Sequence, residues 1–234
     1  MEALKQEVLE ANLLLPEYGL VLFTWGNASA LDPESGLVVI KPSGVRYAGM
    51  TADQMVVADP ESGKVVEGAL RPSSDADTHF ELYRRFPGVR GIVHTHSTYA
   101  VAFAQAGRGV PCYGTTHADY FYGEVPCTRA LRPEEIRTDY ELNTGRVIAD
   151  MFSERALDPQ ATPGALVCGH GPFTWGASAK AAASNAAYLE EAARMALLSE
   201  QAAGGRFSPV AQELMDKHYY RKHGAGAYYG QPQS

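Results

Sequence analysis

The stretch GIVHTHS, at residues 91–97, decides the fold, because it joins a short apolar run to two histidines. The segment before it, from Ser74 or Asp75 to Phe86, has the pattern of a helix with an N-cap at its start, and residues 98–106 after it have the small-residue composition of another helix. Helix-like and strand-like segments alternate along the whole chain, without an internal repeat or a linker. The sequence therefore predicts one α/β domain over residues 1–234.

Further elements are expected on both sides of this strand. Apolar residues at helical spacing predict a helix over residues 2–15, which Pro16 and Gly19 end. MVVAD and KVVEG are typical of short edge strands separated by a turn. The other strand-like stretches are VLFTWGNASALD (21–32), LVVIKPSG (37–44) and ALVCGHGPFTWG (165–176). Helices are expected at 133–155, about 178–202 and 208–223, and residues 224–234 are expected to form a mobile tail.

Composition limits the class of protein. The chain has 234 residues, of which 45% are apolar, so it can build one sizeable core. Its formal net charge is −7 and its basic residues are scattered, which argues against nucleic-acid binding. Cys112, Cys127 and Cys168 fit no disulfide or zinc pattern and are expected to be reduced core thiols. The acidic amphipathic N-terminus and the lack of an apolar run of about 20 residues predict a soluble, cytoplasmic protein.

Three histidines form a candidate metal site. His94 and His96 stand two residues apart in a strand context, where side chains at i and i+2 point to the same face. His170 ends another apolar run, between two glycines that allow a ligand to approach closely. Three His ligands leave an open coordination position, as catalytic zinc sites do, and manganese or cobalt would also suit. Asp75, at a helix start, is expected to bind the metal or to act as a base beside it. The alternative is a set of ordinary strand-end histidines.

Three short segments are typical of anion-binding turns: WGNAS (25–29), KPSG (41–44) and RPSSD (71–75). Successive backbone N–H groups in such turns form concave sites for anions. Ser73 and Ser74 precede a helix whose N-terminus favours phosphate, and Lys41 can supply a positive charge. The alternative is that each segment is an ordinary turn or an N-cap. Together they suggest a phosphorylated substrate.

Residues 111–129 form an irregular, aromatic stretch of the kind found in active-site or interface loops. Within it, Asp119 is a candidate proton carrier, because burial is expected to raise its pKa; an Asx-turn residue is the alternative. Tyr228 and Tyr229 belong to the expected tail, which would have to fold over a site in its own subunit or a neighbour's. His218 and His223 lie near the end of the last predicted helix, where the helix dipole favours histidine anyway.

The chain resembles the class II aldolase/epimerase family through seven motifs that follow the family's order: WGNAS, VIKPSGV, RPSSDADTH, GIVHTHS, GTTHADYFYG, HGPFTWG and DKHYYRKHGAGAYYGQ. The resemblance extends from the first helix to the last few residues. It implies a three-layer α/β/α fold around a mainly antiparallel central sheet. It also implies a C4 tetramer with active sites at subunit interfaces. Within the family the motifs are most similar to those of pentulose-phosphate epimerases, which implies inversion at C4 through cleavage and re-formation of the C3–C4 bond.

The resemblance also assigns roles to residues. It implies proton transfer by Asp119 and Tyr229, with Tyr229 contributed by the adjacent subunit and His218 in support. In simple aldolases of the family a Glu that serves as the base stands where this chain has Asp75, which favours an epimerase. The zinc ligands that it implies are His94, His96 and His170, with Asp75 completing the set. The residues that it implies for the substrate phosphate are Gly26, Asn27, Ser43, Gly44, Ser73 and Ser74.

Three other interpretations remain open at this point. An aldolase or a sugar-phosphate dehydratase of the same family would use the same motifs. A non-catalytic interaction domain also occurs on this fold, but it lacks the metal ligands that His94, His96 and His170 would supply. A purely structural metal domain is disfavoured, because three histidines leave a coordination position open.

Overall fold

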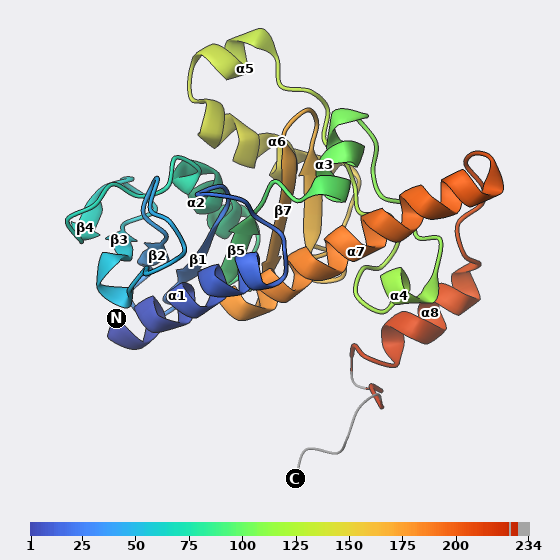
Figure 1. The fold of residues 1–234 in the computed structure, drawn as a ribbon, viewed down its shortest axis with the longest axis horizontal. Helices are drawn as coiled ribbons and strands as arrows, with labels where there is room; N and C mark the ends of the chain where they lie inside the picture. The colour runs from blue at the N-terminus through green and yellow to red at the C-terminus, as the bar shows by residue number, and fades with distance from the viewer. Residues whose placement is uncertain (225, 229–234) are drawn as a thin grey trace.

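The computed structural model describes residues 1–224 and 226–228, and these residues form one seven-stranded sheet (Figure 1). The strand order is β4-β3-β2-β1-β5-β7-β6, and every neighbouring pair is antiparallel. The strands are β1 (Asn27–Leu31), β2 (Val38–Ile40), β3 (Val56–Ala58), β4 (Val65–Glu67), β5 (Gly91–His94), β6 (Gly164–Val167) and β7 (Gly171–Gly176). The prediction of a single α/β domain around a mainly antiparallel sheet is therefore confirmed.

Strand β5 pairs with β1 on one side and with β7 on the other, and all of its residues are buried. Its register places His94 opposite Asn27 of β1 and Phe173 of β7. The strand ends at His94, so the prediction that His96 shares its strand geometry was wrong: the chain turns there to begin the next helix. The start of β1, the end of β5 and the start of β7 meet at one end of the sheet.

Two other strand predictions need correction. MVVAD was expected at an edge, but β3 lies between β2 and β4, and only β4 is exposed at that edge. The predicted strand over 21–32 begins only at Asn27. The residues before it form a loop, because Phe23 and Gly26 have φ angles of 56° and 76°, which an extended strand excludes.

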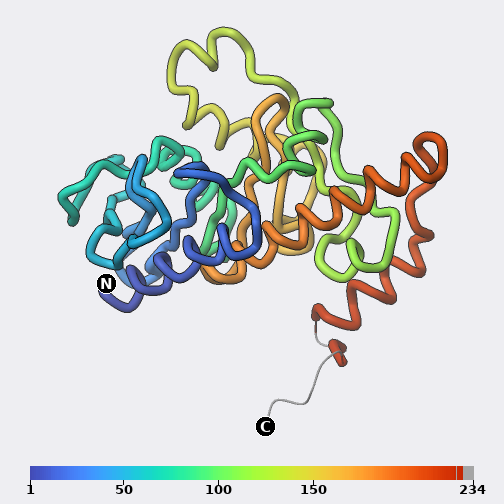
Figure 2. The backbone as a smooth tube through the Cα atoms, in the orientation of Figure 1, coloured from blue at the N-terminus to red at the C-terminus, as the bar shows by residue number. Residues whose placement is uncertain are grey.

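Helices cover both faces of the sheet and create three layers (Figures 1 and 2). Successive side chains of β2 point to opposite faces of the sheet and belong to different core clusters. Val38 and Ile40 pack with α2 and α6, whereas Val39 packs with α1 and α7. The helices are α1 (Glu2–Glu17), the 3₁₀ helix η1 (Ala52–Gln54), α2 (Ala76–Arg85), α3 (Thr98–Gln105), α4 (Thr115–Ala118), α5 (Pro133–Arg137), α6 (Tyr140–Glu154), α7 (Ala179–Ala203) and α8 (Gln212–Tyr220). The expected three-layer arrangement is confirmed.

The helix predicted over 133–155 is in fact two helices. Thr138 has non-helical dihedral angles between α5 and α6, and the Asn143 side chain donates to the Glu135 carbonyl across the break. The last helix is also shorter than predicted, since residues 208–210 lie outside any helix and Val210 donates its N–H to the carbonyl of Cys112. Tertiary contacts, rather than local helix preference, set both boundaries.

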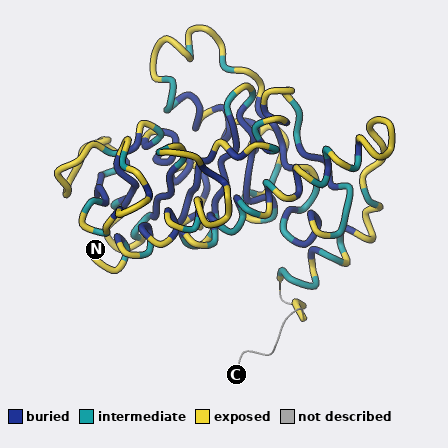
Figure 3. The backbone as a smooth tube through the Cα atoms, viewed as in Figure 1, coloured by how far each residue is buried: buried dark blue, intermediate teal, exposed yellow. Residues whose placement is uncertain are grey.

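Burial is concentrated in the sheet and the helix faces that cover it, whereas α5 and β4 are largely exposed (Figure 3). Strand β5 approaches the start of α7 so closely that a Cβ atom on Gly91 would lie 2.2 Å from the Ser178 carbonyl carbon. No larger residue fits there unless the helix moves. This contact fixes β5 against the longest helix, α7.

All three cysteines are free, as expected. Cys112 and Cys127 are buried, whereas Cys168, predicted to lie in the core, is only partly buried. Within the described residues, no helix has the length and apolar character required to cross a membrane.

Candidate active site

The end of β5 and two connecting segments bring the three predicted histidines together at one end of the sheet. His94 ends β5, His96 follows two residues later, and His170 lies in the turn between β6 and β7. One ligand nitrogen from each ring lies within 4.8 Å of the other two. The Nε2 atoms of His94 and His96 are 3.1 Å apart. Two nitrogens that bind one tetrahedral zinc ion lie roughly 3.3 Å apart, so this spacing suits a shared metal ion.

The backbone fixes the ring orientation of His94. Its Nδ1 lies 2.9 Å from the carbonyl oxygen of Pro172, which can only accept, so Nδ1 donates and Nε2 keeps a lone pair for a metal. Phe173 stacks on the same ring, with centroids 4.3 Å apart. Burial lowers the pKa of His170 to about 3 and also lowers the pKa of His96. Both rings are therefore neutral at physiological pH, which is the form that binds metal.

Asp75 occupies the N-cap position of α2, as predicted, but its side chain makes no capping bond. Instead its Oδ2 accepts a 2.7 Å hydrogen bond from the amide of Asn27, which also donates to Ser73. Burial favours the neutral acid, but the electrostatic interactions with His94 and His79 and the hydrogen bond from Asn27 outweigh it and hold the pKa of Asp75 below its ordinary value. The carboxylate is ionised beside the histidines. It lies outside the cluster of three nitrogens, so its role as a fourth ligand stays a prediction.

A single cavity of about 430 Å³ joins the histidines to the predicted anion-binding segments. The second and third segments run side by side, because Ser43 donates its N–H to the Arg71 carbonyl and Ser73 donates to the Lys41 carbonyl, both at 3.0 Å. The lining includes every residue predicted to bind metal or phosphate: Gly26, Asn27, Lys41, Ser43, Gly44, Ser73, Ser74, Asp75, His94, His96 and His170. The fold thus unites segments that are far apart in the sequence.

Lys41 is the cationic side chain of this lining, and only 2% of its surface is exposed. Within the described residues its ammonium group makes one long hydrogen bond, 3.4 Å to the Pro42 carbonyl, and no ion pair. Burial lowers the pKa of Lys41 to about 8, so the group is still mostly charged at neutral pH. A buried ammonium ion without a carboxylate partner favours an anionic ligand.

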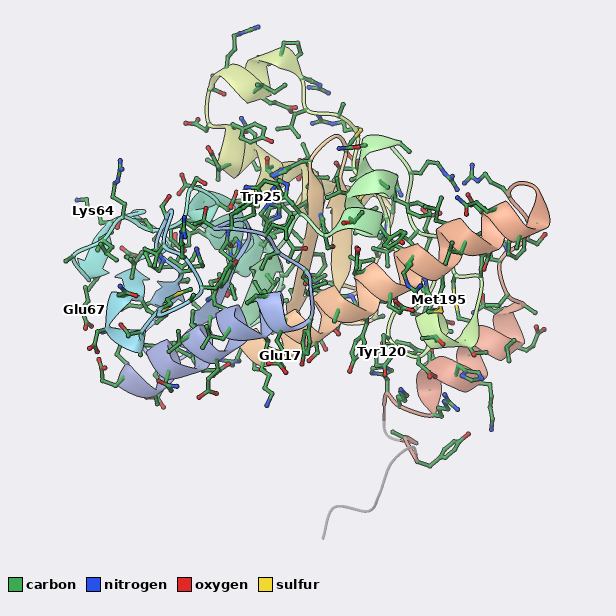
Figure 4. All side chains as sticks on the ribbon, viewed as in Figure 1. Glu17, Trp25, Lys64, Glu67, Tyr120 and Met195 are labelled. Atoms are coloured by element: carbon green, nitrogen blue, oxygen red, sulfur yellow. The ribbon has the colours of Figure 1, made fainter. Side chains whose placement is uncertain are left out.

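Asp119 does not line this cavity in its own chain. It follows α4 and faces α8, where Arg221 donates to both carboxylate oxygens at 3.0 and 2.6 Å and His218 Nδ1 lies 3.0 Å away. In Figure 4, Trp25 at the cavity and Tyr120 beside Asp119 lie in different parts of the molecule. The predicted catalytic residues Asp119 and His218 therefore meet each other, but they do not meet the histidine cluster of the same chain.

The charge state of Asp119 differs from the prediction. Burial alone would raise its pKa, but the hydrogen bonds from Arg221 and His218 and the nearby charge of Lys222 outweigh burial and hold the pKa below its ordinary value. The expectation of a raised pKa was wrong, because it overlooked His218 on α8 and Arg221 and Lys222 just after that helix. An ionised carboxylate can accept a proton at neutral pH. Tyr229, its predicted partner, lies outside the described residues.

Three residues of the cavity lie outside the predicted anion-binding segments and the histidine cluster: Thr24, Tyr140 and Glu141. Tyr140 begins α6, and its hydroxyl lies 3.4 Å from His170 Nδ1. One continuous helix was predicted here, so nothing marked Tyr140 as a residue at a helix start. The Thr138–Asp139 pair, which is typical of an N-cap region, is the signal that would have revealed it.

We expect Tyr140→Phe to weaken metal binding by about tenfold. A hydrogen bond from a ligating histidine to a neighbouring residue orients the imidazole ring and raises its basicity. Competition with a chelator, followed by quantification of bound metal, measures the change. Tyr122→Phe is a matched control, since its hydroxyl bonds Asp216 away from the cavity. Equal metal affinity in Tyr140→Phe and the wild type would contradict a role for Tyr140 in holding His170.

Comparison with known proteins gives concordant matches. Residues 6–197 match the family model described as Class II Aldolase and Adducin N-terminal domain. The chain is 57% identical over 231 residues to proteins named L-ribulose-5-phosphate 4-epimerase UlaF from Salmonella paratyphi A and Salmonella typhi. Each alignment covers 99% of this chain and 100% of the relative.

Solved structures share the fold at lower identity. An L-fuculose 1-phosphate aldolase superposes with a TM-score of 0.77 at 23% identity, covering 94% of this chain and 95% of that one. An L-fuculose 1-phosphate aldolase from Glaciozyma antarctica PI12 has a TM-score of 0.74 at 21% identity, covering 97% of this chain and 84% of that one. At these identities the likeness establishes the architecture alone.

Proposed function

This chain belongs to the class II aldolase family, and from that premise we propose that it is a zinc-dependent isomerase that interconverts L-ribulose 5-phosphate and D-xylulose 5-phosphate. The full-length 57% identity to proteins named L-ribulose-5-phosphate 4-epimerase supports this activity. The observation that carries it is one cavity in which three histidine nitrogens and three anion-binding segments meet. A reaction on a sugar phosphate requires both parts, one for the phosphate and one for the reacting oxygens.

The donor set fits a divalent metal ion. His94, His96 and His170 offer three neutral imidazoles, and the ionised Asp75 stands in the same cavity as the proposed fourth ligand. Zinc suits these donors best, and manganese or cobalt could replace it. Bound there, the metal would supply Lewis-acid chemistry that polarises oxygen atoms of the substrate and stabilises developing negative charge.

The substrate phosphate is proposed to lie against the three anion-binding segments. Lys41 offers the buried positive charge, and Ser43 and Ser73 offer hydroxyl groups on adjacent segments. Helix α2 begins directly after Asp75, so the dipole and N–H groups of its N-terminus favour an anion at the third segment. These contacts would keep the phosphorylated fragment in the cavity while the sugar is cleaved.

Inversion at C4 without a redox cofactor requires cleavage of a carbon–carbon bond. The carbonyl group is at C2, so the hydrogen on C4 is not acidic. Loss of the C4 hydroxyl proton lets the C3–C4 bond break, which leaves its electron pair on C3 and makes C4 the aldehyde of glycolaldehyde phosphate. The aldehyde rotates, C3 attacks its other face, and the new C4 alkoxide takes a proton. Two proton carriers on opposite faces are needed.

We assign these proton transfers to Asp119 and Tyr229, with His218 as the residue that supports Asp119. The ionised carboxylate of Asp119 suits the accepting role. Because Asp119 does not line the cavity of its own chain, a neighbouring copy has to supply it. We therefore propose a C4 homotetramer whose active sites lie between subunits, so that one copy contributes the histidines and the next contributes the proton carriers.

Incubation of the zinc-loaded protein with L-ribulose 5-phosphate tests the proposed activity. An epimerase produces D-xylulose 5-phosphate until equilibrium, without accumulating fragments. An aldolase accumulates dihydroxyacetone and glycolaldehyde phosphate, and a dehydratase releases water to give a product of lower mass. Either of these results, or no conversion at all, would contradict the proposal. The variant His96→Asn, prepared in parallel, controls for contaminating enzymes.

A further inference from the structure

Tyr47 is a buried tyrosine that connects two of the three anion-binding segments. It lies three residues after the second segment, and only 6% of its surface is exposed. Its hydroxyl lies 2.6 Å from the Trp25 carbonyl oxygen and 2.9 Å from the Gly26 carbonyl oxygen, so it donates to the backbone of the first segment. Its ring lies under Lys41, with Nζ 5.0 Å from the centroid. One side chain thus contacts both a loop backbone and the buried cation.

The hydroxyl contact fixes the orientation of two successive peptide units. In a trans peptide the N–H points away from the C=O, so the N–H groups of Gly26 and Asn27 point away from Tyr47. The loop has little freedom elsewhere, because Gly26 has φ 76° and a Cβ atom there would lie 2.8 Å from the His94 carbonyl oxygen. Tyr47 therefore holds the first segment at the point where it passes the metal-binding strand.

The ring contact holds the cation. An anion site needs a cation that stays in place before the anion arrives. Within the described residues Lys41 has no carboxylate partner, and its one hydrogen bond is long. An aromatic face attracts an ammonium ion without neutralising it. Tyr47 can therefore keep Lys41 buried and charged while leaving the N–H donors of the ammonium group for a ligand.

We propose that Tyr47 is a positioning residue that preorganises the phosphate-binding half of the cavity, holding the first segment through its hydroxyl and Lys41 through its ring. The inference rests on the proposed function, since it takes the substrate phosphate as the ligand of these segments. Tyr47 acts through Lys41 and the loop. Binding to a preorganised site costs less free energy, because the loop and Lys41 are already ordered before the ligand arrives. Loss of Tyr47 therefore weakens phosphate binding.

Two substitutions separate the two contacts, with inorganic phosphate as the probe. Tyr47→Phe keeps the ring under Lys41 and removes the hydroxyl that bonds the first segment. We expect its phosphate dissociation constant to rise about 3–10-fold. Tyr47→Leu removes both contacts, and we expect a further rise of about threefold or more. Isothermal titration of the zinc-loaded protein measures both constants without reference to activity. In turnover, KM should rise more than kcat falls, because the phosphate is bound in the ground state and in the transition state.

Tyr83→Phe is the matched control. Tyr83 is as buried as Tyr47, and its hydroxyl also makes a hydrogen bond, 2.8 Å to Ser29, but it packs on the other face of the sheet. It should lose stability without losing phosphate affinity. If Tyr47→Leu does not fold, Tyr47→Phe decides the question. Unchanged phosphate affinity in Tyr47→Phe, or an equal loss in Tyr83→Phe, would overturn the proposal.

The same titration separates this inference from the proposed reaction. A protein that binds phosphate through Tyr47 but does not convert L-ribulose 5-phosphate would support the role of Tyr47 and reject the epimerase. A wild-type protein that does not bind phosphate at all would overturn the role of Tyr47. An active epimerase whose phosphate affinity is indifferent to Tyr47 would reject only the inference.

Discussion

Asp119→Asn is expected to lower kcat with L-ribulose 5-phosphate by about 10²–10⁴-fold, the usual contribution of a general acid or base. The carboxamide cannot accept the C4 hydroxyl proton at neutral pH. Zinc content, measured on the same samples, should stay near that of the wild type, because Asp119 is not part of the three-histidine cluster that would hold the metal. Asp216→Asn controls for loss of a carboxylate around α8, since Asp216 contacts Tyr122 and Gln212 instead. Loss of zinc together with activity would mean that Asp119 supports the fold.

Hybrid assemblies test whether Asp119 acts in the neighbouring subunit. Asp119→Asn chains keep the histidines, and His96→Asn chains keep Asp119, so each homomeric variant lacks one half of every site. In randomly mixed tetramers about a quarter of the sites would combine both intact halves, which should restore about a quarter of the wild-type activity. Co-expression with two different tags, followed by purification on both, provides the hybrids. Hybrids as inactive as the separate variants would contradict a site shared between copies.

His96→Asn is expected to abolish tight zinc binding and to lower kcat/KM by about 10³-fold or more, since Lewis-acid stabilisation contributes several kcal/mol to the transition state. Removal of one imidazole leaves two of the three nitrogens that lie within 4.8 Å of one another. Metal quantification after dialysis, together with turnover of L-ribulose 5-phosphate, measures both effects. Thermal unfolding of the metal-free forms serves as the control, because His96 is exposed and its loss should leave the fold intact. Retention of full activity would remove His96 from the metal site.

Local sequence patterns predicted the parts of the site that local structure controls. The apolar run before His94 and the glycines around His170 indicated two chain segments that meet at one end of the sheet, and the register of β5 with β7 bears this out. The serines of segment 71–75 indicated a helix start, and α2 begins there. In each case a few neighbouring residues determine the backbone, so the pattern carries the information.

Contacts between distant segments could not be predicted in the same way. The pKa of Asp119 depends on His218 and Arg221, which lie in and at the end of the last helix. The local sequence THADYFYG does not predict these partners. Tyr47 reaches Trp25 through the packing of two loops, and Tyr140 enters the cavity only because the helix over 133–155 is interrupted. Tertiary packing overrides local preference at such positions.

Titration of the metal-free protein with zinc tests most directly whether the three histidines form the catalytic metal site. The protein without metal should not convert L-ribulose 5-phosphate. Activity should then rise in proportion to added zinc and reach its plateau at about one ion per chain, the capacity of a single three-histidine cluster. His96→Asn should show no such end point. Full activity in the metal-free protein, or a plateau unrelated to the number of chains, would contradict the metal-dependent mechanism.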